Sequence, residues 1–573
     1  MDPSGPRLTR RVAFWSRIVS DSEKIRDQKR ATGLGPRLEL PLGVRIALVT
    51  LPLSFLGVFY AWPFLTLVAE VVDVEVVGDT LGRTGLGRIV WFTCWQAIAS
   101  TVVTMAAGML PTYLVARWDF PGRRGLTALL TVPFLLPTVV VGAAFVAVLP
   151  ERLERGAFAI VAAHVFFNIA VVVRVVGGVW SQLPDDLVRA ARVLGAGPWR
   201  ATREVTLPLL RPALVAAASI TFLFTFTSFG VVRILGGAGR ATIEVEIARR
   251  ALALGDVGGA AVLSLLQLAL LGVLVGVTVR AQRRGTVRLG LSATQAPRPR
   301  TRRARATVAV GALACATVVL APLAALALDS VRPSGRWSLT AWRTMGDAPA
   351  RPGAGAPVDA WSAIATSLRA ATAATAIALV VGTLAALAIA SARRAGRLLD
   401  VGSMLPLGTS AVTIGFGMLI TFDHGAFDWR AQPWLVSVGH ALVAVPFVVR
   451  AILPVLRARP VGWREAAALL GASPVRAWWE VDVRLLRRPL VVGACFAAAV
   501  SLGEFGATTF LSRTGHETLP VAIERLLGRA GDIPRAQASA LALVLAAVTT
   551  VVLIGVELLD RPTADRAAPS EVR

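Results

Sequence analysis

The chain has 573 residues, of which 55% are hydrophobic and only 17% are charged. This composition is too apolar for a soluble protein of several domains and is typical of a membrane protein. Its net charge of +25 comes from 60 Lys and Arg against 35 Asp and Glu, and the basic clusters are separated by long apolar stretches. A nucleic-acid-binding protein gathers its charge on one solvated face. We therefore expect a lipid bilayer, and no nucleic acid, as partner.

Residues 1–43 are polar and basic, whereas a secretory signal would carry its apolar core closer to the start. They are expected to form a cytoplasmic tail. The three cysteines, Cys94, Cys315 and Cys495, lie far apart in apolar stretches. Because they lack the spacing of a zinc or redox site, no metal site is expected.

Apolar segments long enough to cross a bilayer, which takes about 20 helical residues, follow in two sets. The first set lies near 44–68, 90–116, 125–149, 156–180, 212–233 and 259–279, and the second near 306–328, 363–391, 400–421, 433–456, 489–511 and 537–558. The pattern predicts an all-α integral membrane protein of about 12 transmembrane helices.

The two sets define two transmembrane domains, 44–279 and 306–558. The basic, proline-marked segment 280–305 joins them, and a short tail, 559–573, ends the chain. Arginine crowds every second connection, including the linker, whereas the opposite connections are acidic or mixed. By the positive-inside rule, the arginine-rich connections, the linker and both termini are predicted to be cytoplasmic.

The two domains repeat each other at an offset of 276 positions. Matching pairs are His164 and His440, Arg174 and Arg450, Gly195 and Gly471, Glu204 and Glu480, and Phe229 and Phe505, whereas Gly142 and Gly415 differ by 273. Because each half has an even number of spans, the repeat is parallel, with a pseudo-two-fold axis along the membrane normal and a pathway between the halves. The duplicated histidines are expected to form hydrogen bonds between packed helices.

The longest cytoplasmic loop of each half follows its fourth span. These loops read DDLVRAARVLGAGPWRATREVTLPLLRP at 185–212 and GWREAAALLGASPVRAWWEVDVRLLRRP at 462–489. In each, glycine is expected to end a short helix in the left-handed conformation, and proline to start the next helix. Loops of about 30 residues are much longer than plain helix connections, and their small alanines would let a partner approach closely.

These loops resemble the EAA loop of type I permease subunits of binding-protein-dependent ABC importers, whose pattern is Glu-Ala-Ala, three residues, Gly and a later Leu-Pro. The second loop has Arg484 where the proline stands, and the first has Arg189 in place of the glutamate. The residues matched to ATPase coupling are Ala190, Ala191, Gly195, Pro208, Glu465, Ala466, Ala467 and Gly471. The resemblance implies that coupling loops 181–211 and 457–488 seat on two ABC ATPase subunits, and that an extracytoplasmic solute-binding protein is the other partner.

The segments TSFGVVRILGGAGRATIEVEIARRAL (227–252) and SLGEFGATTFLSRTGHETLPVAIERLLG (501–528) resemble the fused permeases of ferric-iron and thiamine importers. This resemblance implies transport of a small solute of one of these classes across the cytoplasmic membrane of a prokaryote. Neither lysine, Lys24 or Lys29, follows a glycine, so the chain has no P-loop. We therefore expect no cofactor, no catalytic residue and no enzymatic activity, with ATP bound by a partner subunit.

Polar residues and glycines within the spans are candidates for the translocation path. Glu504 lies within the eleventh span and matches Ser228 of the first half. It either lines the path, as for a cation, or makes a hydrogen bond between helices or lies near the outer mouth. Gly230 and Gly506 would allow helices to bend or approach closely near a gate, and Asn168 is expected to hydrogen-bond across helices. The path candidates are therefore Ser228, Gly230, Glu504, Gly506 and Asn168.

A secondary transporter of the major facilitator type is the alternative, since it too has twelve spans in two parallel halves. Its support is Asp119, Gly122, Arg123 and Arg124 after the second span, which weakly resemble a loop motif of that family. The second half lacks the matching aspartate. The coupling loops favour the ABC permease, because a carrier driven by an ion gradient has no ATPase to dock.

Overall fold

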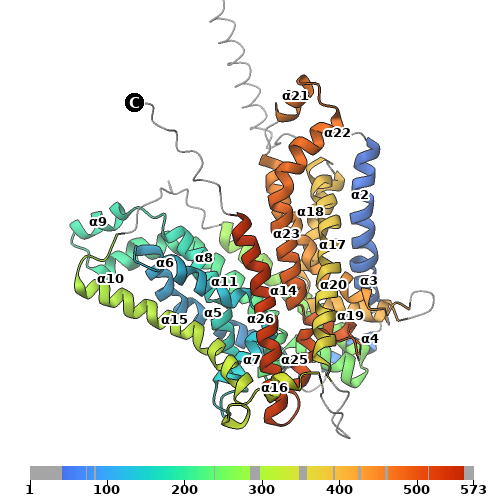
Figure 1. Ribbon diagram of the computed structural model, residues 1–573, viewed down its shortest axis with the longest axis horizontal. Coiled ribbons are helices and arrows are strands. Elements are labelled where there is room, and N and C mark those ends of the chain that lie inside the picture. The colour runs from blue at the N-terminus through green and yellow to red at the C-terminus, as the bar shows by residue number, and fades with distance from the viewer. Residues whose placement is uncertain are drawn as a thin grey trace, which may run out of the picture.

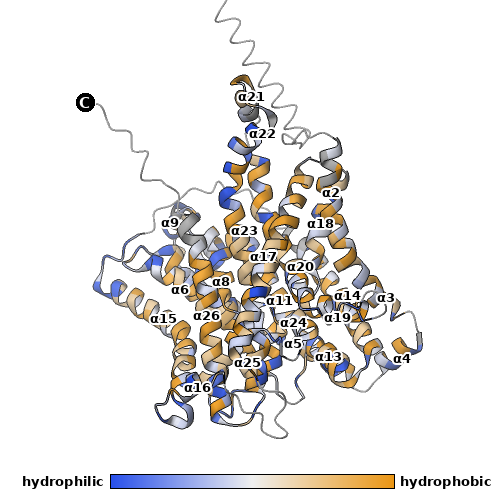
Figure 2. Cartoon of the chain, turned by 45° about the vertical axis from the view of Figure 1, so that its right-hand side comes forward, coloured by the Kyte–Doolittle hydropathy of each residue, from blue (hydrophilic) through white to orange (hydrophobic). Residues whose placement is uncertain are grey.

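The computed structural model describes residues 42–71, 74–82, 85–237, 239–283, 297–346, 358–391, 394–423, 428–430, 432–458, 462–513 and 515–560. Within these residues the regular structure is entirely helical. Ten helices are long and apolar enough to cross a membrane, and two bent pairs raise the number to 12. The predicted all-α membrane fold is thereby confirmed. Apolar residues predominate along the long helices, and hydrophilic residues gather at their ends (Figure 2).

Nearly all of the predicted N-terminal tail, half of the linker and most of the C-terminal tail lie outside the described residues. The first repeat comprises α2 (Leu42–Leu56), α3 (Trp62–Ala69), α4 (Val74–Gly82), α5 (Leu86–Arg117), α6 (Arg123–Leu135), α7 (Thr138–Val148), α8 (Ala157–Trp180), α9 (Asp185–Val193), α10 (Pro198–Ala201), α11 (Leu207–Phe226), α12 (Gly230–Leu235), α13 (Ile243–Ala248) and α14 (Val257–Arg283). A π-helical turn, Gly57–Ala61, joins α2 to α3 in one span.

The second repeat follows the same order. It comprises α15 (Arg302–Val331), α16 (Thr340–Arg343), α17 (Ala360–Ser391), α18 (Arg394–Gly408), α19 (Ala411–Thr421), α20 (Trp434–Ala458), α21 (Gly462–Leu469), α22 (Pro474–Ala477), α23 (Arg484–Gly503), α24 (Gly506–Leu511), α25 (Leu519–Leu527) and α26 (Asp532–Asp560). Helices α7 and α19 have 11 residues each and begin 273 positions apart, as the shorter upstream offset predicted. The parallel repeat therefore holds helix by helix.

The third and ninth spans, predicted as single helices over 125–149 and 400–421, are sharply bent. Helix α6 meets α7 at 104°, and α18 meets α19 at 100°. Pro137 directly precedes α7 and has no N–H with which to continue α6. At the second bend, the Ser410 side chain accepts a hydrogen bond from the Val412 N–H and so caps α19. Proline within an apolar run can signal such a break, but hydropathy alone, which defined the spans, gives no angle.

The fifth and eleventh spans also differ from the prediction, which extended them to residues 233 and 511. Helix α11 ends at Phe226 and α23 ends at Gly503, and the chain restarts as the short helices α12 and α24. Both short helices are almost wholly buried. Each packs against the second part of a bent span, α12 against α7 and α24 against α19. The breaks thus collect in one buried region.

The first span of each repeat packs against the other repeat. Helix α2 lies on α17 and α18, whereas α15 lies on α5, α6 and α7 (Figure 1). The Tyr60 and Thr409 hydroxyl groups are hydrogen-bonded across the first of these contacts, at 2.6 Å. In the second, a Cβ added to Gly311 would lie 2.9 Å from a methyl group of Leu114. The two repeats are therefore interlocked.

The packing of α19 against α24 can be tested at Gly415, where an added Cβ would lie 2.6 Å from the Ala507 Cα. We predict that Gly415→Val lowers stability by about 1–3 kcal/mol through overpacking. Gly276→Val is the matched control, because nothing lies within 4 Å of a Cβ at that helical glycine. Thermal unfolding of both variants in detergent checks the prediction, and equal melting temperatures would contradict it.

Candidate coupling loops and translocation gate

Each coupling loop is a short helix, a tight bend and a second short helix, as predicted. Gly195 and Gly471 have φ of +86° and +83°, in the left-handed region that favours glycine. Helices α10 and α22 then begin at their prolines. The Ser473 hydroxyl accepts a hydrogen bond from the Arg476 N–H at 3.3 Å, which caps α22. Helices α21 and α22 lie beyond the long helices, at the top of Figure 1.

The matched residues of the two loops have matching environments. Ala190 and Ala466 are exposed, and Ala191 and Ala467 are half-buried on the next position of each helix. The two loop glycines and Pro208 are exposed. Glu465 lies in α21, but its side chain is outside the described structure.

A pair of apolar side chains projects from the end of each first coupling helix. Val193 and Leu194 are 88% and 87% exposed, and Leu469 and Leu470 are 89% and 88% exposed. Sequence reasoning missed these pairs, although their repetition 276 positions apart could have drawn attention to them. Exposed apolar pairs at equivalent places in both repeats mark a surface suited to a protein partner.

An ion pair follows the bend in each loop. Arg200 and Glu204 lie 3.0 Å apart in the first loop, and Arg484 and Glu480 lie 3.0 Å apart in the second. Arg484 stands where the family pattern has proline, so the substitution adds a surface ion pair within one helical turn. Both pairs are exposed, and each therefore stabilises its helix by only about 0.3–0.5 kcal/mol.

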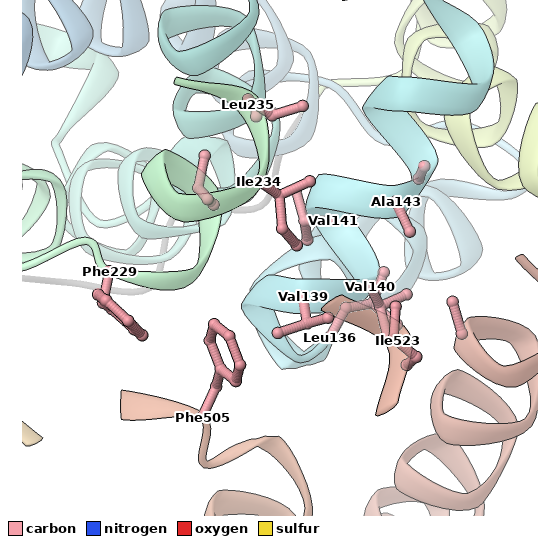
Figure 3. Close-up of a cluster of buried hydrophobic side chains, with 14 of the residues drawn as sticks. Leu136, Val139, Val140, Val141, Ala143, Phe229, Ile234, Leu235, Phe505 and Ile523 are labelled. Atoms are coloured by element: carbon pink, nitrogen blue, oxygen red, sulfur yellow. The ribbon is translucent and has the colours of Figure 1, made fainter. Parts of the chain in front are cut away.

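The repeats meet at a buried aromatic pair. Phe229 and Phe505 occupy equivalent positions, and their ring centroids are 5.1 Å apart (Figure 3). Equivalent residues can touch only on the pseudo-two-fold axis, so this contact lies on the axis between the halves. Pro137 of the first repeat lies 3.5 Å from the Cβ position of Gly503 in the second. We call the aromatic pair and the four helix breaks around it the gate.

Gly230 and Gly506 begin the two short helices beside the aromatic pair. A Cβ on Gly230 would collide with the Thr138 hydroxyl at the start of α7. A Cβ on Gly506 would lie 3.2 Å from the Val412 N at the start of α19. Absence of a side chain thus allows each short helix to approach the bent span of its own repeat.

A buried histidine connects three helical segments in the first repeat. His164 on α8 is hydrogen-bonded through Nδ1 to the Ser100 hydroxyl of α5, at 3.0 Å, and through Nε2 to the Ser228 hydroxyl at the break, at 2.9 Å. The predicted hydrogen bonding between packed helices is confirmed. The expectation for Asn168 is wrong, because its Nδ2 donates to the His164 carbonyl of the same helix and its Oδ1 has no partner in the described structure.

The second repeat has a related arrangement, in which both hydrogen-bond partners of the histidine belong to the fifth span. His440 on α20 is hydrogen-bonded to the Ser501 hydroxyl of α23 and to the Thr508 hydroxyl of α24, each at 2.7 Å. The Thr508 hydroxyl is also 2.9 Å from the Glu504 carbonyl. In both repeats a histidine therefore ties the fourth span to the broken fifth one.

Glu504 lies at the break between α23 and α24 and is 8% exposed. Its Oε1 accepts a hydrogen bond from the Ala507 N–H at 3.0 Å, at the start of α24. A carboxylate is favourable at this position, since the backbone N–H groups there lack helical partners. Ser228, its counterpart, is engaged by a histidine instead.

Sequence reasoning missed a second buried carboxyl group, that of Glu244. This residue lies on α13, is 1% exposed and accepts a hydrogen bond from the Gln267 Nε2 at 2.8 Å. Its helix, α13, packs against α19 of the other repeat, which begins at the second bend. Glu244 falls in a segment predicted to be an outer connection, which the structure instead folds back to the gate. An acidic residue among apolar neighbours, in TIEVEIA, was the available clue.

The described residues contain no group of three or more His, Cys, Asp or Glu side chains that could hold a metal ion. Two interlocked helical repeats, paired surface loops and a gate on the axis between them define a membrane permease of the tandem-repeat type. The family model for the inner membrane component of binding-protein-dependent transport systems matches residues 107–288 and 340–564. The chain belongs to this family, and it is a multi-pass inner membrane protein.

Relatives of the chain are permeases. The thiamine transport system permease protein of Brucella abortus (strain 2308) is 28% identical over 544 residues, which cover 90% of this chain and 95% of the relative. That of Escherichia coli (strain K12) is 26% identical over 77% of this chain and 84% of its own length. A putative 2-aminoethylphosphonate transport system permease protein of Salmonella paratyphi A is 30% identical over 35% of this chain and 76% of its own length. The alternative of a major-facilitator carrier finds no support.

Proposed function

We propose that this chain is the permease subunit of an ATP-driven importer of thiamine or a closely related cationic solute. The observation that carries the proposal is the likeness to thiamine permeases, which extends over 90% of this chain and 95% of the relative's length. This likeness favours thiamine over ferric iron. The chain itself would bind no ATP and catalyse no reaction, because hydrolysis would belong to two separate ATPase subunits.

The proposed orientation puts both termini and both coupling loops on the cytoplasmic side, where an ATPase subunit would seat on each loop. The arginine-rich connections and the paired exposed apolar side chains support this assignment. The permease domains would be 44–279 and 306–558, with the linker 280–305 also cytoplasmic. An extracytoplasmic solute-binding protein would dock at the opposite end, which includes α16 and α25 (Figure 1).

In the proposed mechanism, ATP binding draws the two ATPase subunits and their coupling loops together. The repeats then separate at the outer end, and hydrolysis returns them to the inward-open arrangement. The nucleotide can drive this change only if it binds one arrangement more tightly than the other. The helix breaks beside Phe229 and Phe505 concentrate the movement at the gate, because a broken helix can pivot without losing backbone hydrogen bonds elsewhere.

The chemistry of the gate suits an aromatic cation. Thiamine carries a permanent positive charge on its thiazolium ring, and such a ring is attracted to the faces of aromatic side chains. Phe229 and Phe505 supply those faces, Glu504 directly precedes Phe505, and Glu244 lies on α13, which packs against α19 of the gate. Buried carboxyl groups in a membrane protein often mark an ion or substrate path. We therefore propose these four residues as contacts of the solute in transit.

The proposal predicts that the purified chain alone hydrolyses no ATP. Activity should appear in proteoliposomes that also contain the ATPase partner, and should rise with thiamine-loaded binding protein. Uptake of labelled thiamine, compared with ferric iron and other small solutes, identifies the substrate. Hydrolysis by the isolated chain, with contaminating ATPases excluded, would contradict the assignment of catalysis to a partner, and uptake of iron alone would contradict the assignment of thiamine.

The coupling surface can be tested with Leu469→Asp/Leu470→Asp and Val193→Asp/Leu194→Asp. Each apolar side chain buried at an interface contributes about 1.5–3 kcal/mol, so loss of two should weaken assembly with the ATPase by roughly 100-fold or more. Leu339→Asp is the control, since Leu339 is also exposed, at 53%, but lies outside both loops. Copurification and coupled ATP hydrolysis measure the effect, and undiminished assembly of both double variants would rule out this surface.

The path contacts can be tested with Glu244→Gln and Glu504→Gln, which remove an ionisable group while nearly preserving shape. We expect thiamine uptake to fall at least tenfold, while protein abundance and ATP hydrolysis stay near wild type, because a passing cation favours the ionised carboxylate and glutamine cannot ionise. Glu151→Gln is the control, as Glu151 is an exposed carboxylate. Uptake at the wild-type level in both variants would show that these residues do not contact the solute. Loss of protein abundance in Glu504→Gln would show instead that Glu504 serves to cap α24.

A further inference from the structure

A large basic pocket opens at the end of the first repeat opposite the coupling loops. Its volume is about 690 Å³, and every lining residue lies between positions 85 and 254. Six arginines contribute to its lining, namely Arg88, Arg155, Arg233, Arg240, Arg249 and Arg250. Neither gate phenylalanine and no residue of the four helix breaks lines it, so the pocket lies apart from the gate, although α12 extends from one to the other.

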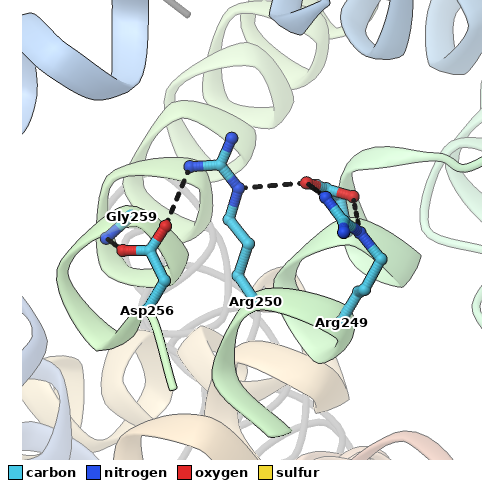
Figure 4. Close-up of polar contacts among 5 residues, drawn as sticks. Arg249, Arg250, Asp256 and Gly259 are labelled. Carbon is cyan, nitrogen blue, oxygen red and sulfur yellow. Dashed lines mark hydrogen bonds and ion pairs between the residues drawn. The ribbon is translucent and has the colours of Figure 1, made fainter. Parts of the chain in front are cut away.

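The inner wall of this pocket is fixed by ion pairs. Arg250 is 6% exposed and lies 3.0 Å from Glu246 and 3.4 Å from Asp256 (Figure 4). Asp256 in turn accepts a hydrogen bond from the Gly259 N–H at the start of α14. Arg249 also forms an ion pair with Glu246, at 2.7 Å, and its own side chain is 51% exposed. The wall is therefore rigid, and its outer guanidinium group remains accessible.

The rim of the pocket has positive charge without acidic partners. Arg88 and Arg240 are exposed, and neither has an ion-pair partner among the described residues. Arg240 packs over Gly156, whose φ of +121° and lack of a side chain leave room for the guanidinium group. The six arginines face four paired carboxylates, those of Glu154, Glu246, Asp256 and Glu524. Two positive charges thus remain for an anionic partner.

The second repeat has a smaller pocket at the equivalent place. Its volume is about 300 Å³, and its lining includes Arg369, Arg513 and His516. Both pockets lie among the start of the second span, the start of the fourth span and the loop after the short helix of the gate. A basic hollow therefore recurs on both sides of the pseudo-two-fold axis, as expected for one partner that contacts both repeats.

We infer that the arginine pocket receives acidic side chains of the solute-binding protein and anchors its docking to the first repeat. This inference rests on the proposed function, which supplies the partner. The pocket lies outside the gate, so a solute in transit does not need it, whereas a docking protein must contact this end. Opposite charges across an interface accelerate encounter and fix orientation, and salt weakens them.

The test measures the affinity of solute-loaded binding protein for the complete permease–ATPase complex in nanodiscs. At low salt we expect Arg88→Glu/Arg240→Glu to weaken docking at least tenfold, with a smaller loss for Arg88→Gln/Arg240→Gln. High salt screens the charges and should therefore reduce the difference in docking affinity between the variant and wild type. Arg302→Glu/Arg303→Glu is the matched control, because both arginines are exposed at the start of α15, at the end proposed to be cytoplasmic, and the change in net charge is equal.

Docking of Arg88→Glu/Arg240→Glu at wild-type affinity, or an equal loss in the control, overturns the inference alone. The inference is also overturned if the variant loses docking only in nanodiscs that contain anionic lipid. It is overturned as well if inorganic phosphate, added without the binding protein, separates wild type from the variant in the same way. If the wild-type complex docks no solute-binding protein at all, the proposed importer function fails as well.

Discussion

Inside a bilayer, every backbone N–H and C=O group must find its partner within the protein, and the whole structure follows from that constraint. Helices satisfy it locally, so the described chain is helical throughout its regular structure. Broken helices satisfy it only where protein surrounds them. All four breaks lie in the buried region where the repeats meet, and side chains such as Ser410 and Glu504 accept hydrogen bonds from the freed N–H groups. A place for movement between the repeats thus arises where irregular backbone is tolerated.

The buried polar groups of the gate connect helices that would otherwise share only apolar contacts. In hydrocarbon surroundings, packing alone discriminates weakly between helix partners, and a hydrogen bond between side chains adds direction. His164 and His440 fulfil this role in the two repeats, each joining its fourth span to the segment that carries a gate phenylalanine. Duplication of the bonds with different partners, Ser228 in one repeat and Thr508 in the other, shows that geometry rather than a particular side chain is repeated.

The sequence predicted the span count, the parallel repeat and the helix–bend–helix loops because each depends on local composition or on positions that recur at a fixed offset. The bends at Pro137 and Ser410 were missed because the spans were assigned from hydropathy, which gives no direction; Pro137 was a signal for the first break, whereas the angle depends on packing. Glu244 was missed for a related reason: hydropathy assigned its short segment to an outer connection, and only tertiary packing returns it to the gate. Asn168 was misjudged because an amide can bond its own helix as readily as a neighbouring one.

The exchange of first spans between the repeats has a consequence for biogenesis. Helix α2 is synthesised first, but α17 and α18, on which it packs, begin roughly 300 residues later. At about 5–20 residues per second, the ribosome needs about 15–60 s to make that stretch. During this interval α2 must wait in the membrane with its future contact face towards lipid. Apolar residues lie on every side of α2, so its future contact face tolerates lipid until the second repeat arrives.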